Sequence, residues 1–223
     1  ARLAARGTVR VKLELDCGWE GEYTSQNVIG EITGRSKPDE VVVIGGHLDS
    51  WDLGTGAIDD GAGVAISMAA GHLIGALPKA RRPARTIRVV AFANEEQGLW
   101  GGRAYAQKHA ANLRKHQIGA ESDFGAGRVY AFAQALAPLG IEHRTDGEGC
   151  GPDLIPFGAI GLACATLAQD GSDYFDLHHT PDDTLDKIDP QALAQNVAAY
   201  AVFAYLAADA QGDFGSAPKT PAP

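Results

Sequence analysis

Two short apolar runs constrain the fold of this chain more than any other feature. Val41–Ile44 is β-branched and shows no polar alternation, and Ile87–Ala93 also reads as a buried strand, as expected of strands that are covered on both faces. Between them, Asp60–Leu77 is apolar nearly all round, which favours a buried helix. Strands interleaved with helices in this way predict an α/β layer fold with a central, largely parallel sheet.

Other segments continue this alternation. The expected strands are Val9–Leu15, which alternates apolar and polar residues, Val28–Ile32, Ile118–Ser122, Arg128–Phe132 and Leu162–Leu167, and the expected helices are Gly98–His109, Ala133–Leu139 and one that begins at Asp189-Pro190. No turn residue separates Arg128–Phe132 from Ala133–Leu139, although a strand and a helix need a connection of a few residues. Either the assignment of this piece is wrong, or a loop and part of a helix are missing from it.

Composition narrows the range of partners. The 223 residues carry 19 Lys and Arg against 28 Asp and Glu, a net charge of −9, and a nucleic-acid-binding protein needs a basic face that this balance does not supply. The basic stretch Lys79–Arg88 follows Pro78 and contains Pro83, and it is interpreted as a solvated loop. The apolar runs are too short to span a bilayer. We therefore expect neither a nucleic-acid nor a membrane partner.

The ends of the chain and its cysteines are less informative. The chain opens at Ala1 without a methionine, and no export signal is visible in it. Residues 1–211 are expected to form one domain, because residues 212–223 are rich in Pro, Gly and Ala and are expected not to pack, as a flexible tail. A disulfide between Cys150 and Cys164 is allowed by the sequence but not required by it.

Polar residues follow the ends of the predicted strands, where sheets of this class place their ligand sites. His47 and Asp49 come after Val41–Ile44, and their i, i+2 spacing puts both side chains on one side of an extended chain. A neutral imidazole is a good zinc ligand, and a nearby carboxylate can fix its tautomer. On its own, however, a histidine at a strand end is more often a hydrogen-bonded structural residue.

Two pairs of adjacent acidic residues continue the pattern. Asp59 and Asp60 open the predicted buried helix, and their carboxylates repel each other unless a cation lies between them. Glu95 and Glu96 follow the second buried strand. Because adjacent side chains diverge, one glutamate can face a metal while the other faces substrate as a general base. Helix capping is the alternative explanation for a member of either pair.

One more aspartate and a second histidine complete the set. Asp123 follows Ile118–Ser122, and His179 lies in the polar loop His178–Thr184. Each could be an ordinary loop residue. With the residues above they make two histidines and several carboxylates without a cysteine, a donor set that suits a pair of zinc-like ions. A carboxylate that bridges two ions about 3.5–4 Å apart would hold both an attacking water and a carbonyl oxygen.

The order of these motifs resembles the co-catalytic zinc exopeptidases, a clan that includes secreted bacterial aminopeptidases and glutamate carboxypeptidases. Within the clan the likeness is closest to the plasma glutamate carboxypeptidases, and it extends from about Val9 to Ala208. The strings that carry it are His47–Asp52, Ala57–Gly61, Asn94–Gly98, Glu121–Asp123 and His178–Thr180. The resemblance implies a three-layer sandwich in which helices flank a mixed, largely parallel β-sheet. It also implies two Zn²⁺ ions per chain and a peptide or dipeptide substrate.

The resemblance also assigns roles to residues of this chain. The implied metal ligands are His47, Asp59, Glu96, Asp123 and His179, with Asp59 between the two ions. Glu95 would be the general base, and Asp49 would hold His47. Asp60 would be joined to Asp59 by a cis peptide bond, and Tyr174 is a candidate for stabilising an oxyanion. His179 is chosen over His178 because the family pattern His-Thr-x-x-Asp-Thr matches His179-Thr180 and Asp183-Thr184.

Two departures from the family pattern accompany the resemblance. The chain begins where relatives have just completed an inserted protease-associated domain, so residues 1–211 would be the C-terminal catalytic portion of a longer protein. The stretch Gly125–Gly140 is shorter than in relatives, at the junction where strand met helix without a turn. The relatives allow a homodimer and imply a secreted or periplasmic location.

Two other functions stay open. A glutaminyl cyclase-like acyltransferase with a single zinc ion would not need His47. A catalytically silent relative that serves as a receptor or scaffold would lose ligands, whereas all of the expected ligands are present in this sequence. An aminopeptidase or dipeptidase is the favoured activity, because carboxylates near the site would suit a free α-amino group.

Overall fold

A central sheet of four strands organises the structure, a computed structural model that describes residues 7–18, 20–132, 142–143 and 149–219. The strands are, in their order across the sheet, β1 (Val28–Ile32), β3 (Arg85–Phe92), β2 (Lys37–His47) and β4 (His116–Glu121). β2 is parallel to both of its neighbours, whereas β1 is antiparallel to β3. The prediction of a mixed, largely parallel sheet is confirmed.

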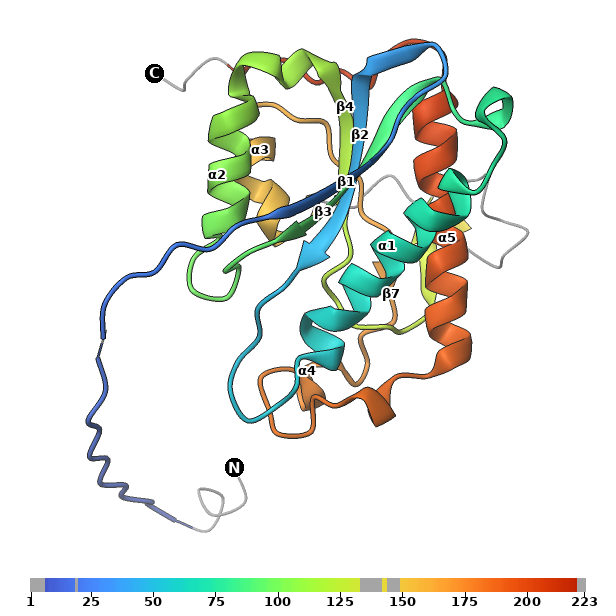
Figure 1. Cartoon of the computed structure of the whole chain (residues 1–223). Coiled ribbons are helices and arrows are strands. Elements are labelled where there is room, and N and C mark those ends of the chain that lie inside the picture. The colour runs from blue at the N-terminus through green and yellow to red at the C-terminus, as the bar shows by residue number, and fades with distance from the viewer. Residues whose placement is uncertain (1–6, 19, 133–141, 144–148, 220–223) are drawn as a thin grey trace.

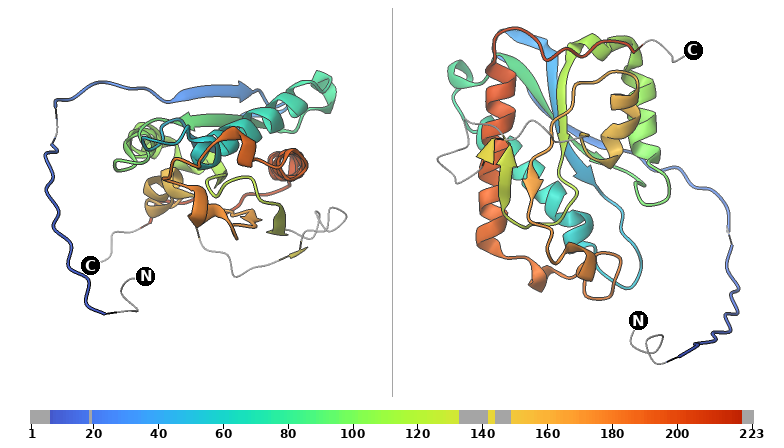
Figure 2. Two further views of the ribbon diagram at one scale, coloured as in Figure 1. Left: turned by 90° about the horizontal axis from the view of Figure 1, so that it is seen from below. Right: turned by 180° about the vertical axis from the view of Figure 1, so that it is seen from behind.

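Helices cover both faces of this sheet, which gives three layers (Figures 1 and 2). One layer contains α1 (Ala62–Gly75) and α5 (Pro190–Asp209), and the other contains α2 (Trp100–His109) and the short α3 (Ile155–Ala159). The helix predicted to start at Asp189-Pro190 is confirmed, since α5 begins at Pro190. The Asp189 carboxylate caps it by accepting a hydrogen bond from the Gln191 amide. The remaining helical segments among the described residues are α4 (Tyr174–Leu177) and the short turns Ala57–Gly61, Lys79–Arg81, Ala110–Lys115, Pro152–Leu154 and Leu185–Lys187.

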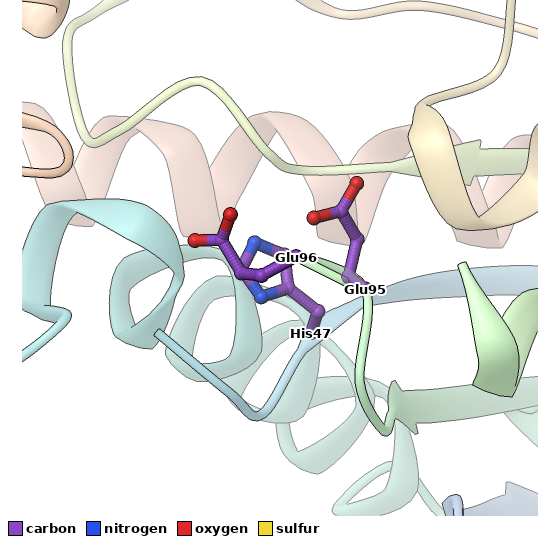
Figure 3. A group of neighbouring side chains, drawn as sticks. All are labelled: His47, Glu95 and Glu96. Carbon is purple, nitrogen blue, oxygen red and sulfur yellow. The ribbon is translucent and has the colours of Figure 1, made fainter. Parts of the chain in front are cut away.

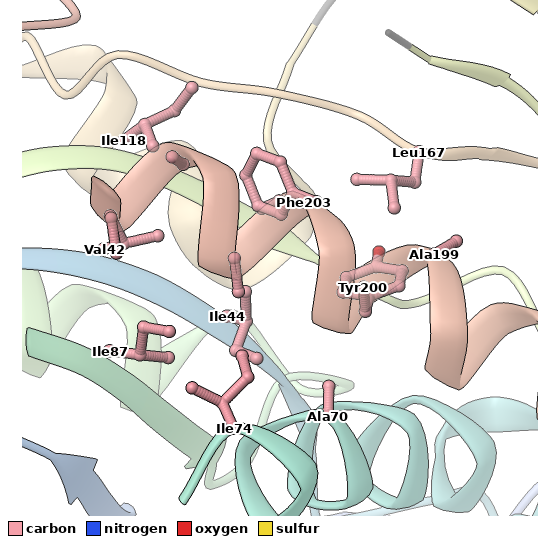
Figure 4. Packing of buried hydrophobic residues seen from close by; sticks show 14 of the residues in the cluster. Val42, Ile44, Ala70, Ile74, Ile87, Ile118, Leu167, Ala199, Tyr200 and Phe203 are labelled. Atoms are coloured by element: carbon pink, nitrogen blue, oxygen red, sulfur yellow. The ribbon is translucent and has the colours of Figure 1, made fainter. Parts of the chain in front are cut away.

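The apolar run in β2 explains why both faces are covered. Val42 and Ile44 pack against α1 and α5 (Figure 4), while Val41 and Val43 belong to the cluster under α2 and α3. All four side chains are at most 5% exposed, and complete burial of such a side chain stabilises the fold by about 1.5–3 kcal/mol. Because β2, β3 and β4 are parallel, their carboxyl ends meet at one edge of the sheet.

A second, smaller sheet lies beside α5. It consists of β6 (Glu142–His143), β5 (Val129–Phe132) and β7 (Ala168–Gln169), with β5 in the middle. The strand predicted at Arg128–Phe132 is therefore present. The predicted helix Ala133–Leu139 and most of the junction that follows it lie outside the described residues.

Two predicted strands are wrong. Residues 7–18 form no strand, and in Figure 1 this part of the chain runs away from the sheet. The alternating residues Val11 and Leu13 are 81% and 72% exposed: alternation is a local signal, and a strand also needs a partner, which no described segment provides here. The segment Leu162–Leu167 contributes only one parallel bridge, between Cys164 and Gly119, before the chain continues into β7.

Three further features differ from or extend the predictions. α1 is not buried all round, since Met68 and Leu73 are 59% and 52% exposed. One residue of the predicted tail packs: Ser216 is buried, and its hydroxyl accepts the Ala163 N–H and donates to the Gln117 carbonyl. The disulfide that the sequence allowed, Cys150–Cys164, is formed. Among the described residues, no helix combines the length and the apolar character that a bilayer crossing needs.

Candidate metal centre

The predicted site residues meet at the carboxyl edge of the parallel strands. His47 is the last residue of β2, Glu95 and Glu96 lie in the loop after β3, and Asp123 lies two residues beyond β4. Figure 3 shows the carboxylates of Glu95 and Glu96 diverging on either side of the His47 ring. The divergence expected of adjacent glutamates is therefore present, and the two side chains face different parts of the site.

Asp59 is the centre of the cluster. Its Oδ1 lies 3.0 Å from His47 Nε2, and its Oδ2 lies 2.9 Å from His179 Nε2. Asp59 belongs to the irregular turn Ala57–Gly61 at the start of α1, while His179 comes from the loop after α4. The two oxygens of one buried carboxylate thus face two histidines that are far apart in the sequence.

A further carboxylate accompanies each histidine. Asp123 Oδ1 lies 3.4 Å from His47 Nε2, and Glu96 Oε2 lies 3.0 Å from His179 Nε2. The donor atoms of His47, Asp59 and Asp123 lie within 4.8 Å of one another, and so do those of Asp59, Glu96 and His179. These two groups share Asp59, as the resemblance implied.

The donor set fits two divalent cations. Glu96 Oε1 and Asp123 Oδ1 are buried and find no hydrogen-bond donor among the described residues, and orphaned buried oxygens of this kind carry a substantial desolvation cost. Imidazole nitrogens and carboxylate oxygens without thiolates are typical zinc ligands. A cation in each group would satisfy the orphaned oxygens and relieve the repulsion between carboxylates.

The pKa values of the cluster residues are shifted by the same excess of negative charge. Burial and nearby carboxylates raise the pKa of Glu95 to about 7, although His47 opposes the rise. Burial lowers the pKa of His47, but the carboxylates of Asp123, Asp49 and Asp59 around its ring outweigh burial and raise that pKa. Burial also acts to raise the pKa of Asp59, but His47 and His179 hold it below its usual value. Burial and Asp59 together raise the pKa of Glu96.

Asp49 contacts the His47 ring through its backbone carbonyl rather than through its carboxylate. His47 Nδ1–H donates to the backbone carbonyl of Asp49 at 2.9 Å, whereas the nearest carboxylate oxygen of Asp49 is 3.7 Å away. The two carboxylate oxygens instead accept the backbone N–H groups of Glu95 and Glu96, at 2.9 and 3.1 Å. The carbonyl therefore fixes the tautomer of His47, leaving Nε2 toward the site, and the carboxylate holds the glutamate loop.

Asp60 supports the site from behind. Its Oδ2 accepts the backbone N–H of His47 at 2.9 Å, and its Oδ1 accepts that of Gly63 at 3.0 Å. A Cβ at Gly46 would lie 2.4 Å from Asp60 Oδ2, so the carboxylate fits only because residue 46 lacks a side chain. The peptide bond between Asp59 and Asp60 is cis, as the resemblance implied. Burial raises the pKa of Asp60 well above its usual value.

Tyr174 packs beside the cluster. Its ring stacks on Phe124 and on His178, each with a centroid distance of 4.6 Å. Burial raises the pKa of its hydroxyl, and Asp123 and Asp59 add to the rise, so the phenol is a neutral donor. Its role toward an oxyanion stays a prediction.

Two residues near the site were not among the predicted site residues. The Asp183 carboxylate is buried and accepts the backbone N–H groups of Ile58 and Asp59. The ring of Trp51 lies edge-on to His179 at 5.9 Å. Asp183 belongs to the family pattern that singled out His179, and Trp51 belongs to the string His47–Asp52, so both were present in the motifs that carried the resemblance.

This fold and this set of donor side chains are typical of one class of protein, the α/β zinc metallopeptidases. Residues 27–134 match Peptidase family M28, and the chain belongs to this family. The chain is 36% identical to mouse Carboxypeptidase Q over 94% of its own length and 47% of the relative's, and 36% identical to the human protein with the same coverage. It thus spans about half the length of the curated relatives it matches.

Solved structures agree with this assignment. The chain is 52% identical to a Peptidase M28 precursor from Shewanella amazonensis, with a TM-score of 0.81 over 87% of this chain and 47% of that one. The similarity to BSAP, a zinc aminopeptidase from Bacillus subtilis, has a TM-score of 0.65 at 22% identity, over 86% of this chain and 52% of that one. At that identity the second match supports the fold alone.

Proposed function

We propose that this chain is the catalytic part of a metal-dependent exopeptidase that uses two zinc ions. The observation that carries the proposal is the position of Asp59, whose two oxygens lie 3.0 and 2.9 Å from His47 and His179. Asp123 and Glu96 extend the cluster on either side, so the proposed ligands are His47, Asp59 and Asp123 for one ion and Asp59, Glu96 and His179 for the other.

Zinc ions bound there would polarise the scissile carbonyl and make a water molecule acidic enough to react near neutral pH. Glu95 is the proposed general base, because its carboxylate lies near His47 and Glu96 but outside both groups that contain Asp59. Burial raises its pKa in the metal-free protein, and a more basic carboxylate suits a group that must first accept a proton and then release it. Glu95 takes the proton from the attacking water and returns it to the leaving amine.

The proposed substrate class follows from the charge of the site. Carboxylates that are not occupied by a metal attract a free α-amino group, which favours an aminopeptidase or dipeptidase over a carboxypeptidase. Tyr174, as a neutral phenol beside the cluster, is the proposed hydrogen-bond donor to the oxyanion. Similarity to Carboxypeptidase Q supports a peptide substrate.

The glutaminyl cyclase alternative has one supporting observation. The fold is similar to that of a glutaminyl cyclase from an Acidobacteriales bacterium, with a TM-score of 0.61 at 22% identity. Against it stands His47, which lies within reach of both Asp59 and Asp123 and would be needed only for a second ion. Zinc content separates the two functions, at two ions per chain for the exopeptidase and one for the cyclase.

The variant Glu95→Gln tests the mechanism. The amide keeps the shape of the side chain but cannot accept the proton, so we expect hydrolysis of dipeptides and aminoacyl amides to fall by about 10²–10⁴-fold. Zinc content, measured by elemental analysis, should stay near that of the wild type. Near-normal turnover in the variant would refute the role of Glu95. A wild-type protein that binds zinc but hydrolyses none of these substrates would support a silent receptor instead.

Two expectations from the relatives remain proposals. A homodimer would have a natural surface on α1, which contains no Asp, Glu, Lys or Arg and exposes Met68 and Leu73. Light scattering after size-exclusion chromatography tests it, and a monomer at micromolar concentration would contradict it. A secreted or periplasmic location is proposed from the relatives alone.

A further inference from the structure

The loop that carries His179 has little regular structure to hold it. It follows α4, which is only four residues long, and the His179 side chain is 42% exposed whereas that of His47 is fully buried. His47, by contrast, is fixed by β2 and by the hydrogen bond from its amide to Asp60. The half of the cluster around His179 therefore needs another source of rigidity.

Asp183 supplies hydrogen bonds that connect this loop to the turn that carries Asp59. Its Oδ1 accepts the Ile58 N–H at 2.6 Å, and its Oδ2 accepts the Asp59 N–H at 3.2 Å. Asp183 is only 3% exposed, so these bonds form away from water, where charge-assisted hydrogen bonds are stronger than neutral ones. One carboxylate thus binds two consecutive amides, one of them that of Asp59 itself.

The backbone of Asp183 reinforces the same connection. Its carbonyl accepts hydrogen bonds from Thr55 N at 2.8 Å and Thr55 Oγ1 at 3.0 Å, and its own N–H donates to Thr180 O at 3.1 Å. Gly54 permits the close approach, because a Cβ there would lie 2.5 Å from Thr180 O. The segments 54–59 and 180–183 are therefore joined along their length.

We propose that Asp183 is a positioning residue that sets the separation between Asp59 and His179, and so determines how tightly the ion between Asp59, Glu96 and His179 is held. The inference rests on the proposed two-zinc function. Asp183 touches neither an ion nor substrate in this arrangement, and it acts through the backbone of Asp59. The ion between His47, Asp59 and Asp123 depends on it less, because β2 and Asp60 hold His47 independently.

Asp183→Asn is the test. The amide offers one acceptor oxygen where the carboxylate offers two, so one of the two N–H groups would face an NH₂ group instead of an acceptor. The probe is zinc itself, titrated into chelator-stripped protein in competition with a chromophoric chelator. We assign the weaker of the two binding constants to the ion beside His179 and expect it to fall by about 10–100-fold, the usual effect of losing a residue that holds a metal ligand in place. The tighter binding constant should change far less. At limiting free zinc the variant should hold one ion where the wild type holds two.

Asp182→Asn is the matched control, because it removes the same charge from the adjacent, exposed position and should leave both binding constants unchanged. If Asp183→Asn does not fold, Thr55→Val removes only the hydroxyl bond to the Asp183 carbonyl and should weaken the same ion by a smaller factor.

The outcomes separate the two proposals. If Asp183→Asn, or Thr55→Val in its place, holds both ions as tightly as the wild type, the inference is overturned. A lower melting temperature of the zinc-free protein with both binding constants weakened equally would show a merely structural role and would also overturn it. A wild-type protein that binds two ions but hydrolyses no peptide would overturn the proposed function and leave the inference standing.

Discussion

Protonation of the buried histidine His116 should destabilise this protein in mild acid. His116 is the first residue of β4 and is 2% exposed. Its Nδ1–H donates to Asn112 O at 3.1 Å, so Nε2 is the acceptor of the Tyr105 hydroxyl at 3.1 Å, with Arg88 Nη1 3.3 Å away. A second proton on Nε2 would remove that acceptor and place a cation beside a guanidinium. Burial, with Arg88 and His109 adding to it, lowers the pKa of His116 to about 4.

The magnitude follows from linkage. The unfolded pKa is about 6.5 and the folded pKa is lower, so the stabilisation is complete above pH 6.5 and is lost as the pH falls toward 4. Each pKa unit corresponds to about 1.4 kcal/mol, so the full loss is about 3 kcal/mol and the loss at pH 5.5 is about 1.4 kcal/mol. This is a large part of the 5–15 kcal/mol typical of a folded domain.

Urea unfolding of the wild type and of His116→Gln between pH 7.5 and 4.5, at constant zinc, measures the effect. Glutamine does not titrate, so the free energy of unfolding of the variant should fall by about 2.5 kcal/mol less than that of the wild type over this range. His72→Gln, at an exposed position on α1, is the control and should follow the wild type. Equal losses in the wild type and in His116→Gln would refute the reasoning.

Two further predictions concern the residues that support the cluster. Gly46→Ala places a Cβ 2.4 Å from Asp60 Oδ2 and 2.8 Å from Val64 N, so it should destabilise the fold by about 1–3 kcal/mol in urea unfolding and weaken zinc binding. Gly30→Ala in β1, where no described atom lies within 4 Å of the new Cβ, should do neither, and equal effects at both positions would contradict the explanation. Asp49→Asn removes one of the two acceptors for the Glu95 and Glu96 amides, so kcat/KM on a dipeptide should fall about tenfold or more while Asp52→Asn, at an exposed position, keeps its activity. If both variants are equally active, the carboxylate of Asp49 does not hold the glutamate loop.

Secondary structure was predictable from the sequence where a buried segment consists almost entirely of apolar residues. Val41–Ile44 is buried on both faces and reads as such, and the bounds of Val28–Ile32 agree with β1. Val9–Leu15 has a strand pattern of equal clarity but no described partner. The alternation of apolar and polar residues shows that a segment can form a strand. Whether it does so depends on a second strand to pair with, which the alternation does not identify. The prediction that α1 is buried all round was wrong for the same reason, because composition does not reveal whether a neighbouring segment covers Met68.

The cluster of histidines and carboxylates was predictable because the proposed chemistry needs particular side chains. Few side-chain types can bind a metal ion, and parallel strands bring His47, Glu96 and Asp123 to one edge of the sheet. The roles of Asp49 and Asp183 were harder to predict, since both carboxylates bind backbone N–H groups. Every residue except proline supplies such a donor, so the identities of Ile58 or Glu95 carry no information about these bonds.

This difference in partners has a consequence for substitution in the cluster. A ligand can be replaced only by another donor, so its loss shows directly in the sequence of a silent relative. A carboxylate that holds backbone amides can be lost while every ligand remains, since Asp183 contributes geometry to Asp59 and no atom to the metal groups. A chain that retains His47, Asp59 and His179 but lacks an acceptor at position 183 would therefore keep the donor set and bind the ion beside His179 weakly. In such chains, activity inferred from the metal ligands alone should be wrong. The residue that accepts the Ile58 and Asp59 amides should therefore be inspected together with the ligands.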